Sequence, residues 1–433
     1  MDSTSLLQAS VHRTEQLLFF TLLQLAVIVL CARVAGNLAV RWGNARAVGE
    51  IMVGILLGPS LFGLLWPAGF ELVFRSAPPE PLTILSQIGL VLLLFQIGLE
   101  FDFAHLRLAQ HRRAVIYVAL AGELLPFALG FGFGVVSAST LFPHGNAFAY
   151  SLFCGTALAI TALPILGRIM LELDLHRTAV GVIAISAAAI DDVVGWLLLA
   201  VVSALAVVHF SAGGFAVKLG LLALYAVVCV LVVRPVLLRL IRRFGVGATT
   251  LPLDLMGILL AAVFVSGMIT YTIGIFAIFG GFMLGVLLHD QRALAQAWRD
   301  KVGHFVNVFF VPIFFTYTGL RTDIRLLDGW AMWGWLALVI ALATLGKLGG
   351  CYAAARVSGM DRRSALAIGI MMNTRALMEL VVINVGYDLG VIPQSVFTML
   401  VLMAIVSTVI TTPALRRWLQ LEPVAELEQG KAA

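Results

Sequence analysis

The chain has 433 residues, of which 61% are hydrophobic and only 12% are charged, and a mean hydropathy of +1.03 excludes a soluble globular domain. The net charge of +5 could suit nucleic-acid binding, but the basic residues are dispersed among short loops, so no nucleic-acid partner is expected. Apolar runs of about 18 residues or more recur along the chain, without the alternation of an outer-membrane barrel. The composition predicts an all-α polytopic membrane protein surrounded by lipid.

The hydropathy pattern predicts thirteen membrane-spanning helices. The N-terminus is polar and carries acids, unlike the basic start of a signal peptide, so we expect the first span to be retained. The predicted spans are approximately 17–36, 47–66, 82–100, 114–137, 147–171, 179–208, 215–238, 252–270, 272–289, 303–320, 330–355, 364–387 and 393–415.

The basic residues predict the orientation of these spans. With this set of spans, 21 of the 28 Lys and Arg residues fall on one side and five on the other, while Lys347 and Arg375 lie inside the membrane. Because cytoplasmic loops carry the excess of Lys and Arg, we expect the N-terminus outside and the C-terminus in the cytoplasm, in a bacterial inner (cell) membrane. The short tail after Trp418 is expected to leave no room for a nucleotide-binding regulatory domain.

The four cysteines indicate neither a disulfide framework nor a zinc site. Cys31, Cys154, Cys229 and Cys351 fall in or beside apolar runs at scattered spacings. We expect a protein that is not an enzyme and needs no cofactor.

The sixth predicted span carries two adjacent acids, Asp191 and Asp192, near its middle. A charged side chain at this depth costs roughly 2.5–3.5 kcal/mol, so such residues usually face a cavity, an ion or a counter-charge. Neighbouring helical residues point about 100° apart, which suggests two different roles for the pair. A capping or loop position is the alternative, but the apolar residues on both sides leave no loop there.

Other polar residues are expected at the same depth. Lys347 lies near the middle of the eleventh span, and Asn373, Thr374 and Arg375 lie at the middle of the twelfth, one turn before Glu379. Arg375 and Glu379 are four residues apart and could simply neutralise each other. A lysine at mid-span is too deep to reach water easily, which disfavours an ordinary snorkelling role for Lys347.

The fifth and twelfth spans are both expected to be interrupted. In the fifth, Thr161 precedes Pro164, which removes a backbone hydrogen bond, although a proline kink alone is often without function. The two spans are seven apart, so they cross the membrane in opposite directions. Paired interruptions of this kind are typical of secondary transporters with inverted repeats. Glu123, in the fourth span, is either a structural partner of Arg375 or part of a proton path.

Several motifs resemble the monovalent cation/proton antiporter-2 superfamily, in particular its cation/H⁺ exchanger branch. They are RAVGEIMVGILLGPSLFG, LLLFQIGLEFD, IFFTYTGLRTDI and, most similar of all, MMNTRALMELVVINVGYDLGVIPQSVFTMLVLMAIVSTVITTPAL. The resemblance covers nearly the whole chain. It implies a Na⁺/H⁺ antiporter-like fold of about thirteen helices, with two inverted repeats whose discontinuous helices cross.

The same resemblance implies a homodimer in which scaffold helices hold a mobile transport core. The implied divisions are scaffold helices 1–3 (1–112), core helices 4–6 (113–209), bridging helix 7 (210–245), scaffold helices 8–10 (246–328), core helices 11–13 (329–420) and a short cytoplasmic tail (421–433).

The resemblance also implies roles for individual residues. Asp192 matches the carboxylate that binds the cation and carries the proton, and Asp191 matches an acid found in many electrogenic members. Lys347 matches the lysine that pairs with this first acid, while Thr161, Asn373 and Thr374 match the helix crossing. Thr161 joins the two acids in the implied cation site, and the crossing and its lining are completed by Pro164 and Arg375. Many potassium-efflux relatives carry Gln-Asp instead of Asp191-Asp192 and a nucleotide-binding domain, so ligand-gated efflux is not expected.

We therefore expect an antiporter that exchanges Na⁺ or K⁺ for H⁺ by alternating access. A partly desolvated carboxylate can hold either a proton or a cation, and competition for one site gives exchange without leakage. Two alternatives remain: a symporter of organic anions on the same scaffold, which Arg375 would favour and the acidic pair disfavours, and a passive channel or sensor.

Overall fold

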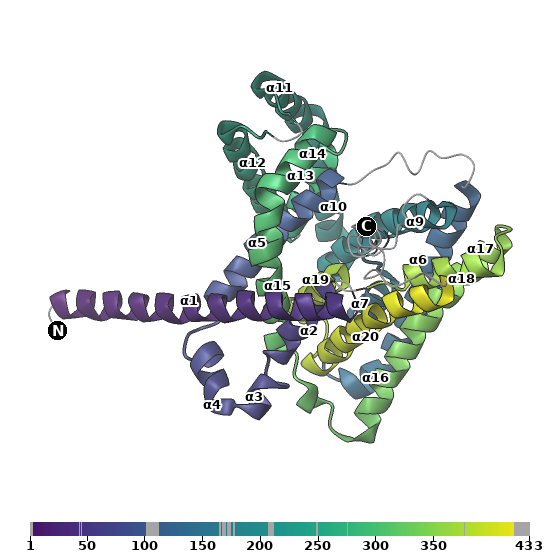
Figure 1. The fold of residues 1–433 in the computed structure, drawn as a ribbon, viewed down its shortest axis with the longest axis horizontal. Helices are drawn as coiled ribbons and strands as arrows, with labels where there is room; N and C mark the ends of the chain where they lie inside the picture. Colours follow the sequence, from purple (N-terminus) through teal and green to yellow (C-terminus); the bar gives the residue numbers. More distant parts are fainter. Residues whose placement is uncertain are drawn as a thin grey trace, which may run out of the picture.

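The protein is seen in a computed structural model that describes residues 3–42, 44, 46–100, 112–163, 166, 170, 175, 178–206, 212–247, 250–274, 276–375 and 377–419. All regular elements within these residues are helical (Figure 1). In chain order the α-helices are α1 (Ser3–Arg41), α2 (Arg46–Leu56), α3 (Phe62–Leu65), α4 (Pro67–Phe70), α5 (Glu80–Glu100), α6 (Arg112–Leu141), α7 (Ala147–Ala159), α9 (Ala179–Ala206), α10 (Ala212–Val228), α11 (Arg234–Phe244), α12 (Leu253–Ile273), α13 (Ala277–Leu287), α14 (Arg292–Trp298), α15 (Val311–Arg321), α16 (Gly329–Thr344), α17 (Gly350–Val357), α18 (Arg362–Met372), α19 (Leu377–Asp388) and α20 (Gln394–Leu419).

Short π-helical turns join several of these helices into longer ones. They lie at Glu71–Arg75, Cys229–Val233, Arg299–Gly303, Val306–Phe310 and Leu345–Gly349, and a 3₁₀ turn lies at Ile324–Leu326. In the described part of the chain, nine helices are long and apolar enough to cross a membrane, or ten if the bent pair Arg292–Gly303 and Val306–Leu326 is one span. The all-helical membrane fold is thereby confirmed, and the count of thirteen spans stays a prediction.

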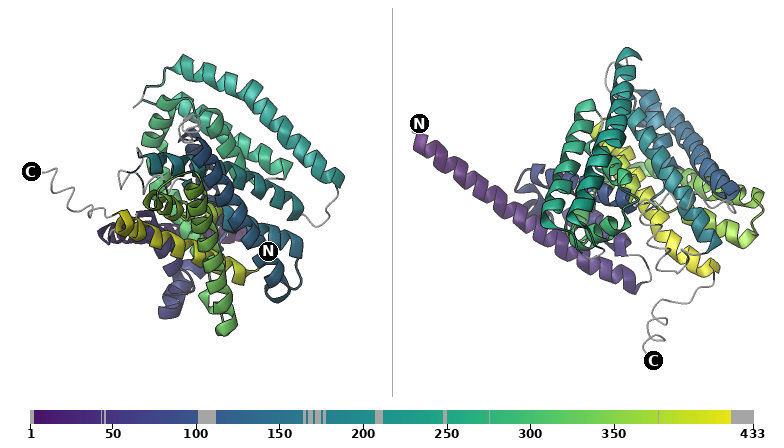
Figure 2. Two further views of the ribbon diagram at one scale, coloured as in Figure 1. Left: turned by 90° about the vertical axis from the view of Figure 1, so that its right-hand side faces the viewer. Right: turned by 90° about the horizontal axis from the view of Figure 1, so that it is seen from above.

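The helices pack in two groups (Figures 1 and 2). In the first group, α5 packs on α13 and α15, α2 packs on α1 and α15, and α12 packs on α13. In the second group, α6 packs on α7, α9 and α17, and α18 packs on α9, α17 and α20. α10 contacts α9 of the second group and α12 of the first, so it lies between them. The N-terminal half of α1 projects beyond the other helices (Figure 1).

Glycines allow the helices of the first group to approach backbone to backbone. Gly54 of α2 faces Gly319 of α15, and a Cβ built on Gly319 would collide with the carbonyl oxygen of Gly54. A Cβ on Gly54 would lie 2.6 Å from the carbonyl carbon and oxygen of Phe315. Small residues at such crossings bring helices into close van der Waals contact in a membrane, where lipid removes the hydrophobic drive for association.

We expect Gly319→Ala to destabilise the protein by about 1–3 kcal/mol, because the added methyl group must push two backbones apart. The measurement is the melting temperature of the detergent-solubilised protein. Gly334→Ala is the matched control, because a Cβ there meets nothing within 4 Å. An equal melting temperature for the two variants would contradict this account of the crossing.

Candidate functional site

Two helices of the second group end near the middle of the protein, and their ends lie side by side. α7 ends at Ala159, where the chain becomes extended at Ile160 (φ −63°, ψ 141°). The other break separates the end of α18 from the start of α19. The backbone N–H of Ala162 donates a hydrogen bond to the carbonyl of Thr374 (3.1 Å), which ties the two breaks together. Pro164 lies outside the described residues.

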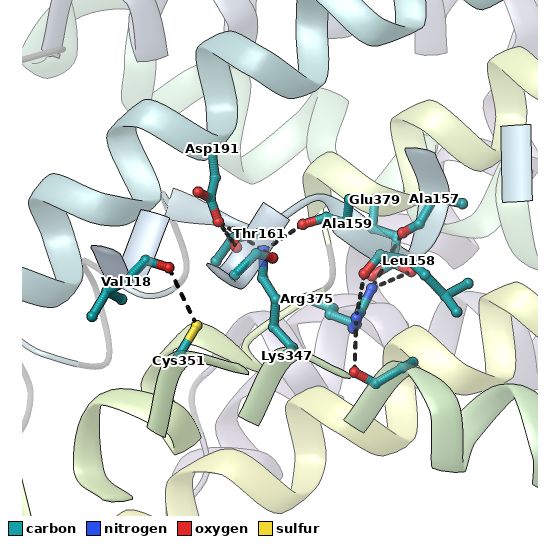
Figure 3. Close-up of polar contacts among 12 residues, drawn as sticks. Val118, Ala157, Leu158, Ala159, Thr161, Asp191, Lys347, Cys351, Arg375 and Glu379 are labelled. Atoms are coloured by element: carbon teal, nitrogen blue, oxygen red, sulfur yellow. Dashed lines mark hydrogen bonds and ion pairs between the residues drawn. The ribbon is translucent and has the colours of Figure 1, made fainter. Parts of the chain in front are cut away.

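The free carbonyls at the end of α7 are satisfied by two cationic side chains (Figure 3). Arg375 donates to the carbonyls of Ala157 (3.2 Å) and Leu158 (2.7 Å), and Lys347 donates to that of Ala159. The last carbonyls of a helix lack partners within the helix and carry partial negative charge. Both side chains are fully buried, so the end of α7 is one reason why two cations are stable at this depth.

Asp191 faces Lys347 and Thr161 (Figure 3). The Lys347 ammonium lies 2.7 Å from Asp191 Oδ2, and the Thr161 hydroxyl donates to the same oxygen at 2.9 Å. Lys347 also donates to the carbonyl of Gly122 on α6 (2.7 Å). Lys347 stands within the π-helical turn Leu345–Gly349, and such turns recur at functional sites because they displace side chains from the regular helical register. The geometry thus brings three of the predicted residues into one cluster.

Asp192 faces a different environment from its neighbour. It is 1% exposed, and neither of its carboxylate oxygens has a side-chain hydrogen-bond partner among the described residues, although the backbone N–H of Leu163 lies near the carboxylate. Asp192 borders a small cavity of about 10 Å³, about the space that one water molecule needs. The other residues lining this cavity are Ile160, Gly195, Met378 and Val382. The accessible lining of this cavity is apolar, so the carboxylate oxygens do not open onto it. Buried carboxylates normally have partners, and it is the two unpaired oxygens themselves that indicate a place for a proton or an ion.

Arg375 forms its ion pair with Glu379, at 3.1 Å and four residues along the chain. Both side chains are fully buried, and Glu379 Oε2 accepts no hydrogen bond from a described residue. Glu123 is 7% exposed, and both of its oxygens likewise have no partner within the described ranges. The carboxylate that contacts Arg375 is therefore that of Glu379, not that of Glu123.

Asn373 and Thr374 are buried at the second break. Their exposed fractions are 6% and 0%, and the side-chain oxygens Asn373 Oδ1 and Thr374 Oγ1 make no hydrogen bond to the part of the chain that is described. The contribution of Thr374 to the crossing is thus its backbone carbonyl.

Some participants had no signal in the sequence. The carbonyls of Gly122 and Ala159 hold Lys347, but any residue has a carbonyl, so only the fold reveals them. Gly195 lies one turn after Asp192 on α9, a spacing that could have marked it as cavity lining. A Cβ there would lie 2.8 Å from Ile160 Cγ1, so a larger residue would crowd the end of the first break.

The comparisons with known proteins agree with this architecture. Residues 19–421 match the family model described as sodium/hydrogen exchanger, transmembrane. The Na⁺/H⁺ antiporter NhaS4 of Synechocystis sp. is 39% identical over 402 residues, which cover 92% of this chain and 96% of the relative. Cation/H⁺ antiporter 18 of Arabidopsis thaliana is 36% identical over 397 residues, which cover 90% of this chain and 48% of the relative, so the chain spans about half the length of that plant protein.

A solved structure shares the fold. The sodium proton antiporter MjNhaP1 from Methanocaldococcus jannaschii matches with a TM-score of 0.66 at 17% sequence identity, over 92% of this chain and 97% of that protein. The resemblance seen in the sequence motifs is therefore confirmed. The chain is an integral membrane protein that belongs to the sodium/hydrogen exchanger family.

Proposed function

We propose that the protein is a secondary antiporter that exchanges a monovalent cation, Na⁺ or K⁺, for H⁺ at the Asp191–Asp192 site. The observation that carries this proposal is the Asp192 carboxylate, buried without a side-chain partner among the described residues, near Ile160 of the first interrupted helix and Met378 of the second. The names of the relatives support the same activity.

The chemistry follows from competition at one carboxylate. An isolated buried carboxylate is costly unless it is neutralised, and either a proton or a monovalent cation can do this. Asp192 would carry the exchanged ion, with oxygen ligands from Asp191 and Thr161. To bind a cation, Asp191 must loosen its contact with the Lys347 ammonium, because the two positive charges compete for Oδ2. Cation binding and release of Lys347 are then coupled.

The two helix groups fit the division expected from the family resemblance. Helices α6, α7, α9 and α16–α20 would form the moving core, while α1, α2, α5, α12, α13 and α15 would form the scaffold. The contacts of α10 with both groups suit a bridge. The proposed protein is a homodimer held by its scaffold helices in a bacterial inner membrane. Its N-terminus would lie outside and its C-terminus in the cytoplasm, an orientation that rests on the distribution of Lys and Arg.

Exchange in proteoliposomes tests the function. The purified protein is reconstituted in liposomes with a pH-sensitive dye inside, and the lumen is made more acidic than the outer solution. Na⁺, K⁺, Li⁺ or an organic carboxylate is then added outside. Antiport predicts proton efflux on addition of a monovalent cation and none with the carboxylate. A response to the carboxylate alone would indicate symport, and a cation flux without opposing proton movement would indicate a channel; either result would contradict the proposal.

We expect Lys347→Ala to change the charge carried in each cycle. Without the ammonium, Asp191 would be a buried unpaired charge and would bind a proton instead, so transport should become electroneutral or shift in its pH profile. The measurement is the current on a solid-supported membrane at several pH values. Arg356→Ala, which removes an exposed cation further along the same helix, is the matched control. An unaltered voltage dependence together with an unaltered pH profile in Lys347→Ala would contradict the proposed pair.

A further inference from the structure

A polar cluster links the last turn of α15 with the last turns of α19. Arg321 forms an ion pair with Asp388 (2.6 Å) and also donates to Asn384 Oδ1 (3.4 Å). One turn earlier on each helix, the Asn384 amide donates to the Thr318 hydroxyl (2.8 Å). Arg321 also donates to the hydroxyl of Tyr317. We call these five residues the α15–α19 latch.

Further contacts hold Arg321 in place. Its guanidinium lies 4.1 Å from the ring centroid of Tyr317 and 5.4 Å from that of Tyr387, distances at which a cation is attracted to an aromatic face. The Gln394 side chain, at the start of α20, donates to the backbone carbonyl of Arg321 (3.1 Å). One arginine is therefore bound by side chains from both helices that follow the second break.

The latch crosses the boundary between the two helix groups. α15 belongs to the proposed scaffold and is fixed there by its backbone contact with α2 through Gly319 and Gly54. α19 belongs to the proposed core and supplies Met378 and Val382 to the wall of the Asp192 cavity. Asp388 follows Val382 by six residues, or about 9 Å of helix. Any displacement of the core along the scaffold must therefore break the latch.

The burial of the latch is graded. Thr318 and Asn384 are 0% and 6% exposed, whereas the side chains of Arg321 and Asp388 are 22% and 33% exposed. The cluster thus closes the space between α15 and α19 on its inner side and meets the surface at its ion pair. Arg321 ends α15 and Arg325 lies in the 3₁₀ turn that follows. Both are among the few basic residues on the side that the charge distribution assigns to the outside.

We propose that the α15–α19 latch stabilises the state in which the Asp192 site is closed to the outer face, and that it must open once in each transport cycle. This inference rests on the proposed antiport. A latch of this kind sets the populations of the two states, so weakening it raises the fraction of protein that accepts the cation from outside and lowers the fraction that accepts it from inside.

Cross-linking tests whether the latch opens. Thr318→Cys combined with Asn384→Cys places two thiols across the boundary, to be joined by a short thiol-reactive cross-linker that reducing agent cleaves. We expect the cross-linked protein to lose cation/proton exchange in proteoliposomes and to regain it on reduction, while Thr318→Cys alone is unaffected by the reagent. If the completely cross-linked protein exchanges ions as fast as the same protein after cleavage of the cross-linker, the latch proposal is overturned. Absence of exchange in the unmodified protein would instead contradict the proposed antiport.

Charge substitutions give a second measurement that does not depend on the cysteines. In oriented vesicles, Arg321→Ala should lower the apparent KM for the outer cation by about two- to five-fold, the range expected for a partly exposed ion pair. Arg321→Asp with Asp388→Arg should restore the original value only in part, because the charge pair returns but the contacts of Arg321 with Tyr317, Tyr387 and Asn384 do not. Arg325→Ala is the matched control, since Arg325 pairs with Asp323 in its own loop (2.8 Å) and does not cross the boundary. An unchanged KM in Arg321→Ala, or a reversed pair no better than either single change, would overturn the proposal.

Discussion

Asn in place of Asp192 is expected to reduce cation-dependent proton movement to the rate of protein-free liposomes. The amide has nearly the shape of the carboxylate, but it carries no negative charge. It therefore cannot bind a proton and a monovalent cation in turn. Asp192 accepts no hydrogen bond from a described side chain, and the amide oxygen of asparagine can accept equally well from the Leu163 backbone N–H near its carboxylate. The variant should therefore fold and fail to transport.

The measurement is dequenching of a pH-sensitive dye after addition of Na⁺ or K⁺, with protein quantity and melting temperature determined in parallel. Asp361→Asn is the matched control: Asp361 caps the first turn of α18 at the surface by accepting hydrogen bonds from two backbone N–H groups, and asparagine caps as well as aspartate. Exchange at the wild-type rate in Asp192→Asn would remove Asp192 from the mechanism.

Arg375→Met is expected to cost about 3–5 kcal/mol of stability from one effect alone, because it leaves the buried carboxylate of Glu379 without its partner. The same change frees the carbonyls of Ala157 and Leu158, each of which costs about 1–3 kcal/mol when buried without a donor. The melting temperature of the solubilised protein reports the loss.

A second substitution separates these contributions. Adding Glu379→Gln to Arg375→Met removes the unpaired charge but leaves the two carbonyls without donors, so the melting temperature should recover only in part. The exposed Arg325→Met serves as the control for loss of a surface ion pair. Equal melting temperatures for Arg375→Met and Arg325→Met would show that the buried arginine does not support the end of α7.

The sequence allowed the breaks to be predicted to different degrees. Pro164 predicted the first break, because a proline inside a helix has no N–H to donate and its ring clashes with the carbonyl of the residue four positions earlier. That residue is Ile160, where the chain leaves the helix. The second break, at Asn373 to Arg375, contains neither proline nor glycine. It exists in the fold because Thr374 pairs with Ala162 and Arg375 reaches the end of α7, contacts that no local pattern encodes.

The charged residues of the site were easier to find than their neighbours. A carboxylate or ammonium in the middle of an apolar span is conspicuous in any sequence, which is how Asp191, Asp192 and Lys347 were predicted. The cavity is lined mainly by apolar residues such as Met378 and Val382, which look like ordinary packing residues. The partner of Arg321 likewise depends on how α15 and α19 are placed in space.

The end of α7 has a consequence for the dynamics of the molecule. Its last carbonyls receive donors from Lys347 on the helix that continues α16 and from Arg375 after α18, so three segments far apart in the chain share one set of hydrogen bonds. None of these segments can open without leaving buried groups of the others unpaired. Amide hydrogen exchange in α7 and α18 should accordingly follow a single opening reaction, as one cooperative unit.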